Sequence, residues 1–278
     1  MKKYQEIETD TSETFKRMTG LSKDNFQDLG EKANTYIEEE KKRNPLKQRG
    51  LRKSKLSLED GILLTLYYLR HYPTFINLAD VFENRSSYCH KIYSRYARIL
   101  AKVETLPNRK NLTLNPPDTL IIDVSEQPIE RPVKGQKPYY SGQKKRHTVK
   151  VQILVSAIGE ILSVDCAKGK QHDFSIFKES DVRIHPDSEL LADSGYQGLN
   201  KFHKNSIIPL KKKKGIPHTD EAKAHNKALS KRRILIENIN RLGKIFRCVK
   251  DVFRGKHKNY GLTWRLVAAL VNLRCSSI

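Results

Sequence analysis

Apolar residues recur at helical spacing through the first third of the chain. A short helical piece follows Thr11, and a second periodic region runs in three segments from Ser57 to about Leu100. Ser57 precedes Glu59 and Asp60, an arrangement typical of a helix N-terminus because these side chains satisfy free backbone N–H groups. The pattern predicts an all-helical N-terminal region.

Within that region, two helices are separated by a tight turn. Pro73 ends one helix, Thr74 is a suitable cap for the next, and a third helix is expected from Ser86 after the turn at residues 83–85. The arrangement is typical of a helix-turn-helix. The third helix would expose side chains that can contact phosphates and base edges, although an ordinary solvated face is the alternative: Ser86, Ser87, Tyr88, His90, Lys91, Ser94 and Arg95.

After a polar stretch with three prolines and three asparagines at 106–117, the pattern changes to that of strands. Strands are expected at 119–124, 147–157, 160–167, 189–193 and 206–210, and helices at 173–180, 222–248 and 262–273. This order favours a mixed α/β fold, a five-stranded sheet flanked by helices, of which the RNase H-like fold is one example. The predicted divisions are a helical segment with a basic linker (1–56), the helix-turn-helix (57–107), a linker (108–117) and the α/β domain (118–278).

Composition narrows the class of partner. The chain has 53 Lys plus Arg against 31 Asp plus Glu, a formal charge of +22, which favours a polyanion. Four widely spaced cysteines without a CxxC motif suggest neither disulfides nor a zinc site. The N-terminus lacks an apolar signal-peptide core, and Arg70 interrupts the most apolar stretch, so we expect no signal peptide, no transmembrane segment, no membrane partner and a cytoplasmic location.

Three carboxylates stand out against apolar surroundings. Asp123 and Asp193 each end a predicted strand, and Glu237 interrupts an apolar run on the long helix. Carboxylate oxygens suit hard divalent cations such as Mg²⁺, and two such ions can activate an attacking hydroxyl and stabilise the leaving oxygen in phosphoryl transfer. The alternative for each residue is ordinary: a strand-terminal Asp often caps a turn, and a helical Glu is often a solvated or paired charge.

Several segments together resemble a known family. In order, they are IIDVSEQPIERP, YYSGQKKRHTVKVQILVSAIGEILSV, GKQHDFSIFKES and LLADSGYQGL, followed by Arg233, Glu237 and Lys244 in the spacing R-x3-E-x6-K. They resemble the DDE transposases of the bacterial insertion-sequence family numbered five, in which a helix-turn-helix usually precedes the nuclease domain. The resemblance covers nearly the whole chain.

The resemblance implies an RNase H-like endonuclease domain in which Asp123, Asp193 and Glu237 are the catalytic, metal-binding acids. It implies two Mg²⁺ ions per active site, with Mn²⁺ as a substitute. Arg233 and Lys244 lie on the same helical stripe as Glu237, so Arg233 is expected to brace that carboxylate and Lys244 to contact DNA phosphate. A surface salt bridge is the alternative for this pair. His147 and Lys150 are further candidates for substrate binding.

Three residues rank behind these. His172 and Asp173 resemble the family's HD pair, and helix capping is favoured over a site role for Asp173. Tyr196, two residues after Ser194 in LADSGYQG, is expected to pack rather than to act in catalysis. Two departures are visible, because Ser230 replaces the tyrosine of the related YREK pattern and Val124-Ser125 replaces a small residue followed by Thr.

The sequence is thus expected to encode a transposase that binds the terminal inverted repeats of its own insertion sequence. It would cleave DNA strands and transfer them to target DNA, acting on double-stranded DNA as a homodimer or larger assembly. The alternatives are a catalytically silent or domesticated DNA-binding protein derived from a transposase, and a structural RNA-binding protein. The latter lacks an RNP-type aromatic motif and leaves the three acids without a role.

Overall fold

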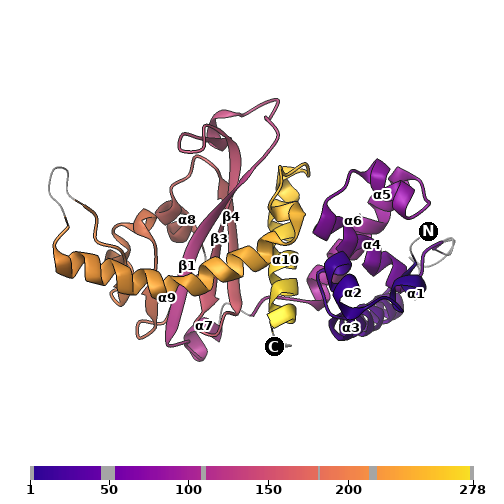
Figure 1. The fold of residues 1–278 in the computed structure, drawn as a ribbon, viewed down its shortest axis with the longest axis horizontal. Coiled ribbons are helices and arrows are strands. Elements are labelled where there is room, and N and C mark those ends of the chain that lie inside the picture. The colour runs from indigo at the N-terminus through magenta and orange to yellow at the C-terminus, as the bar shows by residue number, and fades with distance from the viewer. Residues whose placement is uncertain (1–2, 45–53, 108–110, 181, 213–217, 276–278) are drawn as a thin grey trace. The chain divides into compact units, whose positions relative to one another are not determined.

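The computed structural model describes residues 3–44, 54–107, 111–180, 182–212 and 218–275 (Figure 1). By its internal contacts the chain divides into two compact units. Unit 1 consists of Met1–Thr105, Lys244–Asp251 and Arg265–Ile278, and unit 2 consists of Leu106–Gly243 and Val252–Trp264. The sequence expectation assigned residues 118–278 to one domain, whereas two C-terminal segments belong to the compact unit formed with the N-terminal helices.

Unit 1 is helical. Its helices are α1 (Tyr4–Ile7), α2 (Ser12–Thr19), α3 (Lys23–Arg43), α4 (Leu58–His71), α5 (Phe75–Val81) and α6 (Ser86–Val103), with a 3₁₀ turn at Arg247–Val249. Ser57 and Asp60 form the reciprocal hydrogen bonds of a capping box at α4, and Thr74 caps α5 by accepting from the Asn77 N–H, both as predicted. The basic linker lies largely outside the described residues.

The core of unit 1 joins its first and last segments. Tyr4 stacks on Phe26 with ring centroids 4.9 Å apart, and the Tyr4 backbone N–H donates to Asp60 Oδ1 at 2.9 Å. Asn25 Nδ2 donates to the carbonyl of Leu273 at 3.1 Å. The C-terminal segment is therefore part of the packed helical unit.

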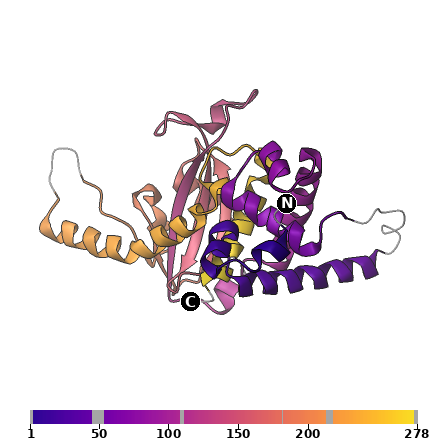
Figure 2. The ribbon, with the colours of Figure 1, turned by 45° about the vertical axis from the view of Figure 1, so that its right-hand side comes forward.

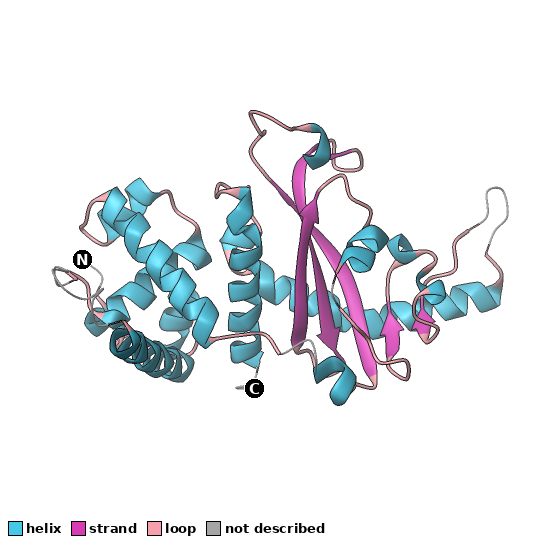
Figure 3. Ribbon diagram, turned by 180° about the vertical axis from the view of Figure 1, so that it is seen from behind, coloured by secondary structure: helices cyan, strands magenta, loops and turns pink. Residues whose placement is uncertain are grey.

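Unit 2 is built on a six-stranded mixed sheet, seen from behind in Figure 3. Its strands are β1 (Thr119–Pro128), β2 (Tyr140–Ser141), β3 (Arg146–Ser156), β4 (Ile161–Lys168), β5 (Glu189–Leu191) and β6 (Ser206–Ile207). β3 pairs antiparallel with β1, β2 and β4, whereas β5 runs parallel to both β1 and β6. The sheet confirms the predicted mixed α/β fold, consistent with an RNase H-like domain, and β2 is the strand that the five-stranded prediction missed.

Helices cover both faces of this sheet (Figures 1 and 3). On one face Leu120, Ile122 and Leu154 of the sheet form an apolar cluster with Tyr196, and α8 (Asp173–Glu179) packs against this cluster. α9 (Asp220–Lys244) crosses the other face. It ends before the predicted residue 248, because the chain leaves the helix for the 3₁₀ turn. The remaining elements are α7 (Asn111–Leu114), α10 (Tyr260–Cys275) and short 3₁₀ helices at Lys137–Tyr139, Ser194–Tyr196, Leu199–Lys201 and His257–Asn259.

No helix among the described residues combines the length and the apolar character needed to cross a membrane. All four cysteines are free thiols, and burial raises the pKa of the Cys248 thiol far above its usual range.

Candidate active site

The sequence predicts Asp123 at the end of a strand, but the structure places it in the middle of β1. The strand continues because Val124 to Pro128 extend the antiparallel ladder with β3, in which Asp123 is the partner of Ile153. Two α9 side chains hold its carboxylate: Arg233 Nη2 donates to Oδ1 at 3.1 Å, and Asn240 Nδ2 donates to Oδ2 at 2.9 Å. The Asp123 side chain is 21% exposed and that of Arg233 15% exposed, so the ion pair is shielded from solvent.

Asp193 occupies the equivalent position beside the neighbouring parallel strand. In the β1–β5 register Ile121 pairs with Leu191. Asp123 and Asp193 each lie two residues beyond this pair. β5 ends at Leu191, and Asp193 caps the following 3₁₀ turn by accepting a hydrogen bond from the Gly195 N–H at 2.8 Å. Because neighbouring strands lie about 4.8 Å apart, this register brings two acids to the same part of the sheet.

Glu237 lies on α9 between the two residues that hold Asp123. Arg233 lies four residues before Glu237, and Asn240 lies three residues after it. This spacing places all three along one side of the helix. Glu237 is exposed, and within the described residues it forms no hydrogen bond or ion pair. The expectation that Arg233 braces Glu237 is therefore wrong, because the guanidinium binds Asp123. Lys244 is the exposed last residue of α9.

Asp173 forms an ion pair with Lys150 and is not the cap of a helix. His172 occupies the cap position of α8 without a side-chain hydrogen bond, whereas Asp173 Oδ1 accepts from Lys150 Nζ at 2.8 Å. The same ammonium donates to the carbonyl of Gln171 at 2.9 Å. A Cβ added at Gly195 would lie 2.8 Å from Asp173 Oδ2 and 3.0 Å from Asp193 Oδ1, so these two carboxylates are neighbours. The preference for capping was wrong because Lys150 already binds the Asp173 carboxylate.

Tyr196 is a buried residue close enough to Asp123, Asp173 and Asp193 to be affected by their charges. Its side chain is fully buried, and its hydroxyl donates to Gln152 Oε1 at 3.1 Å. Burial raises the pKa of the Tyr196 phenol, and the negative charges of Asp173, Asp123 and Asp193 raise it further. The phenol therefore stays protonated near neutral pH, which agrees with a packing role.

The donor types at Asp123 and Asp193 suit a hard divalent cation. Proteins usually hold Mg²⁺ through one or two carboxylates, together with waters and substrate phosphate oxygens. Both oxygens of Asp123 already accept hydrogen bonds from α9, and no three Asp, Glu, His or Cys side chains among the described residues are grouped to hold a metal ion. A carboxylate oxygen that accepts one hydrogen bond keeps a second lone pair, so Asp123 and Asp193 fit such an ion, whereas Glu237 is not brought into a three-acid group in this structure.

Asn240 and Gln152 are site residues that the sequence analysis missed. Asn240 is 7% exposed and Gln152 1% exposed, and both place amide groups beside the residues just described. The signal in the sequence is that each amide interrupts an apolar segment. A polar group buried there is costly unless it is paired, so each side chain needs a partner. His147, by contrast, lies six residues along β3 from the partner of Asp123, in a different pocket.

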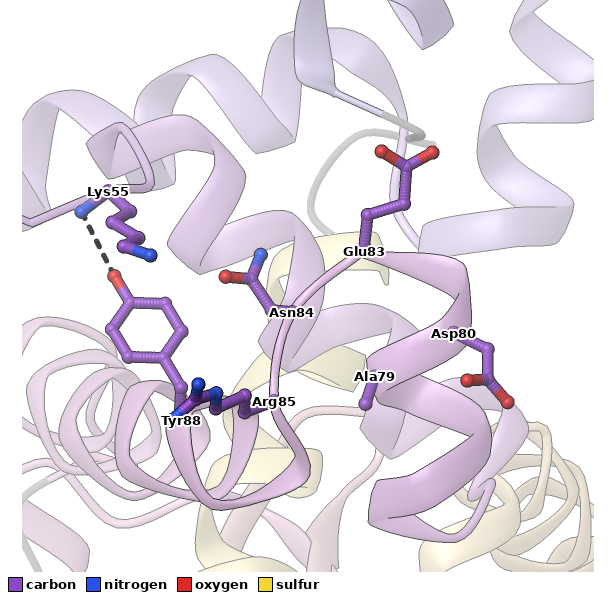
Figure 4. Close-up of a pocket in the computed structure, with 7 residues that line it drawn as sticks. All are labelled: Lys55, Ala79, Asp80, Glu83, Asn84, Arg85 and Tyr88. Carbon is purple, nitrogen blue, oxygen red and sulfur yellow. Dashed lines mark hydrogen bonds between the residues drawn. The ribbon is translucent and has the colours of Figure 1, made fainter.

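The predicted DNA-contacting face of α6 is largely solvent-exposed. Ser86, Ser87, His90, Lys91 and Arg95 are exposed, while Ser94 and Tyr88 are half-buried. The Tyr88 hydroxyl accepts a hydrogen bond from the Lys55 backbone N–H at 3.1 Å, which connects the start of α6 to the residues before α4 (Figure 4).

A pocket of about 750 Å³ lies beside Tyr88 at the turn between α5 and α6. Asp80 and Glu83 line it together with Arg85 and Lys55, so its charge is mixed. A phosphate would meet repulsion from the two carboxylates, whereas the exposed side of α6 carries Lys91 and Arg95. The exposed side of α6 is therefore electrostatically better suited to an anion than this pocket is.

Comparison with known proteins assigns the class. Residues 122–272 match the family described as DDE superfamily endonuclease, and residues 54–103 match the helix-turn-helix of DDE superfamily endonuclease. The chain belongs to the DDE endonuclease superfamily, with its helix-turn-helix before the DDE domain as predicted. It is 35% identical, over 267 residues and 94% of each chain, to the "Probable transposase for insertion sequence element IS702" of Microchaete diplosiphon. The two domains together point to DNA as the partner.

Proposed function

We propose that the protein is a transposase that binds the terminal inverted repeats of its own insertion sequence and catalyses metal-dependent strand cleavage and strand transfer. The observation that carries the proposal is the equivalent placement of Asp123 within β1 and of Asp193 just after the parallel strand β5, with Glu237 one turn from both α9 residues that hold Asp123. Membership of the DDE endonuclease superfamily and similarity to an insertion-sequence transposase support it.

In this proposal each residue has a distinct task. Arg233 and Asn240 orient the Asp123 carboxylate, the Gly195 N–H orients Asp193, and exposed Glu237 supplies the third acid. Exposed Lys244 contributes positive charge that attracts DNA phosphates, whereas the Lys150 ammonium holds the Asp173 carboxylate beside the site. Divalent metal ions, Mg²⁺ or Mn²⁺ and two per site, would supply the activation of the attacking hydroxyl and the stabilisation of the leaving oxygen.

The helix-turn-helix would select the DNA end. The exposed side of α6 offers hydroxyl, imidazole and cationic side chains of the kind that read base edges and hold phosphates. Because an element has two ends, we propose that two or more protomers act together, each carrying one end.

The decisive experiment is cleavage of a labelled duplex that carries the element's own end. The unmodified protein is expected to cut at the repeat terminus with Mg²⁺ or Mn²⁺ and not with EDTA, whereas Asp193→Asn and Glu237→Gln lose at least a hundredfold in rate. Asp187→Asn and Glu179→Gln are matched controls, because both acids are exposed residues outside the site.

Two outcomes would overturn the proposal. Tight, specific binding of the end without cleavage under any metal would identify a DNA-binding protein that has lost the chemistry. Cleavage that survives both Asp193→Asn and Glu237→Gln would show that other residues perform the reaction.

A further inference from the structure

The connection between β1 and β3 forms a pocket that the candidate active site does not use. Figures 1 and 2 show this connection extending beyond the end of the sheet. The pocket has a volume of about 740 Å³ and lies entirely within unit 2. Its lining residues are Arg131, Gln136, Lys137, Tyr140, Gly142, His147 and Lys170.

Short-range contacts give the pocket a defined shape. Tyr140 of β2 pairs with His147 of β3, and their rings lie 5.7 Å apart in a T-shaped arrangement. Arg131 Nε donates to Gln136 Oε1 at 3.0 Å, which fixes the guanidinium at one wall. Lys170 is placed by its backbone N–H, which donates to the Pro138 carbonyl at 3.1 Å.

Gly169 allows the loop between β4 and α8 to lie against Thr148 and the segment at Pro138 and Tyr139. A Cβ at Gly169 would lie 1.9 Å from Thr148 Oγ1 and 2.8 Å from the Tyr139 carbonyl oxygen. Any larger residue would have to push the β4–α8 loop away and would move Lys170 with it. Gly169 therefore helps to fix the position of Lys170 in the same pocket as Lys137.

The pocket is cationic and partly aromatic. Arg131, Lys137 and Lys170 supply three positive charges, and no carboxylate is found among the described residues that line it. Residues 130–147 contain six Lys or Arg and a single acid, Glu130. Tyr140, which lines the same pocket, is 45% exposed. Cations with an accessible aromatic ring are the combination by which proteins hold phosphates and stack an unpaired base.

The pocket lies within reach of a strand bound at the candidate active site. His147 is six residues from Ile153, the β3 partner of Asp123, a separation of about 20 Å along the strand. That length corresponds to roughly six nucleotides at the rise of about 3.4 Å per step that a strand has in duplex DNA, and to fewer nucleotides in an extended single strand. Lys170 also precedes Asp173 by three residues, so the loop that carries this pocket lysine leads directly to Asp173, the first residue of α8.

We propose that this pocket binds single-stranded DNA, with Arg131, Lys137 and Lys170 on the phosphates and one base stacked on Tyr140. The proposal rests on the proposed action at DNA ends, because a strand separated from its complement near the cleavage point supplies the unpaired base. A duplex is disfavoured as the occupant, since its bases are stacked on one another and present no free face to Tyr140.

The test measures binding by full-length Asp193→Asn protein, so that cleavage does not enter the readout. The probes are a 20-nucleotide single strand and a blunt duplex of the same sequence, each bound at several salt concentrations. Adding Tyr140→Ala is expected to weaken single-strand binding about tenfold and leave duplex binding within twofold, whereas Tyr140→Phe keeps the affinity because the ring remains.

A charge variant gives an independent reading. Lys137→Gln with Lys170→Gln should weaken single-strand binding more than duplex binding, whereas Lys16→Gln with Lys250→Gln removes two exposed charges elsewhere and should affect both probes equally. A 2-aminopurine base in the single-stranded arm of a forked substrate should also lose its fluorescence quenching in Tyr140→Ala.

Three results would overturn the assignment: equal losses on single strand and duplex, no loss in either pocket variant, or tighter binding of single-stranded RNA of the same sequence. Failure here is distinguishable from failure of the proposed function. An active endonuclease without Tyr140-dependent binding refutes the pocket alone, whereas Tyr140-dependent binding without any end cleavage refutes the function alone.

Discussion

At the residue scale, the central feature is that both oxygens of Asp123 are held by side chains of α9. Arg233 donates from a charged group and Asn240 from a neutral amide, and neither of these α9 residues is more than 15% exposed. Such bonds fix the rotamer of the carboxylate before any ligand arrives. A site residue oriented in this way loses little freedom when substrate binds.

We predict that Asn240→Ala lowers the rate of DNA-end cleavage about tenfold and changes DNA affinity by less than twofold. The variant removes an orienting hydrogen bond at Asp123 and leaves α6 unchanged. Asn238→Ala is the matched control, because Asn238 is an exposed asparagine two residues away on the same helix. Cleavage kinetics with increasing DNA concentration measure the effect, and an Asn240→Ala protein with unchanged turnover would show that Asp123 needs no such support.

Asn240 and Asp173 show what sequence reasoning could and could not find at this scale. Asp123, Asp193 and Glu237 stand out because charged residues interrupt apolar runs. Asn240 carries no charge, and its role depends on the angle at which α9 crosses β1, which local sequence does not encode. Asp173 was assigned to capping because it begins a helix, but the competing partner Lys150 is 23 residues away in the chain.

At the element scale, α9 is joined to the sheet by ion pairs at more than one strand. Arg233 binds Asp123 of β1, and the neighbouring Arg232 forms a two-pronged ion pair with Glu189, the first residue of β5. Thr119 Oγ1 also donates to the Glu189 carboxylate at 3.4 Å. These contacts fix the helix over the two strands that carry the candidate acids.

This geometry gives a pH-dependent prediction. Hydrogen bonds and charge from Arg232 lower the pKa of Glu189 below its ordinary value. A carboxyl whose pKa is lower in the folded than in the unfolded chain adds stability above its unfolded pKa, and that contribution is lost as the pH falls through the folded pKa. Arg232→Gln should therefore destabilise the protein at pH 7 by up to about 1 kcal/mol and have a smaller effect near pH 3.

Urea unfolding at both pH values measures the difference. Arg241→Gln is the control, since Arg241 is an exposed arginine on the same helix. An effect of Arg232→Gln that is equal at pH 7 and pH 3 would mean that the side chain contributes packing and not charge.

Most elements follow from the sequence pattern, and the misplaced boundaries have local causes. The sequence predicts the first strand at 119–124, because the apolar run ends there, yet β1 extends to Pro128. Ser125 and Gln127 are 8% and 3% exposed, so polar residues continue a strand whose pairing is set by β3. β2 was missed because two residues carry no periodicity and are recognisable only by their pairing with β3.

At the scale of the whole molecule, the net charge of +22 is the dominant property. Its effect on DNA binding is counterion release, so affinity should fall steeply with salt for any sequence. Such binding would mask the contribution of the helix-turn-helix if affinity were measured at one salt concentration. Specific and general contacts can be separated by the slope of affinity against salt, because each lost phosphate contact changes that slope.

The last prediction applies this argument to α6. Lys91→Gln with Arg95→Gln should reduce the slope of log affinity against log salt for the element's end by about two units if both side chains bind phosphates. If Arg95 instead reads a base edge, the slope changes by about one unit and discrimination against an unrelated duplex falls. Lys16→Gln with Lys250→Gln, which removes the same charge elsewhere, should leave the slope within about half a unit of the original. An equal change in both double variants would mean that the whole basic surface, and not the exposed side of α6, determines the binding of this protein to its DNA.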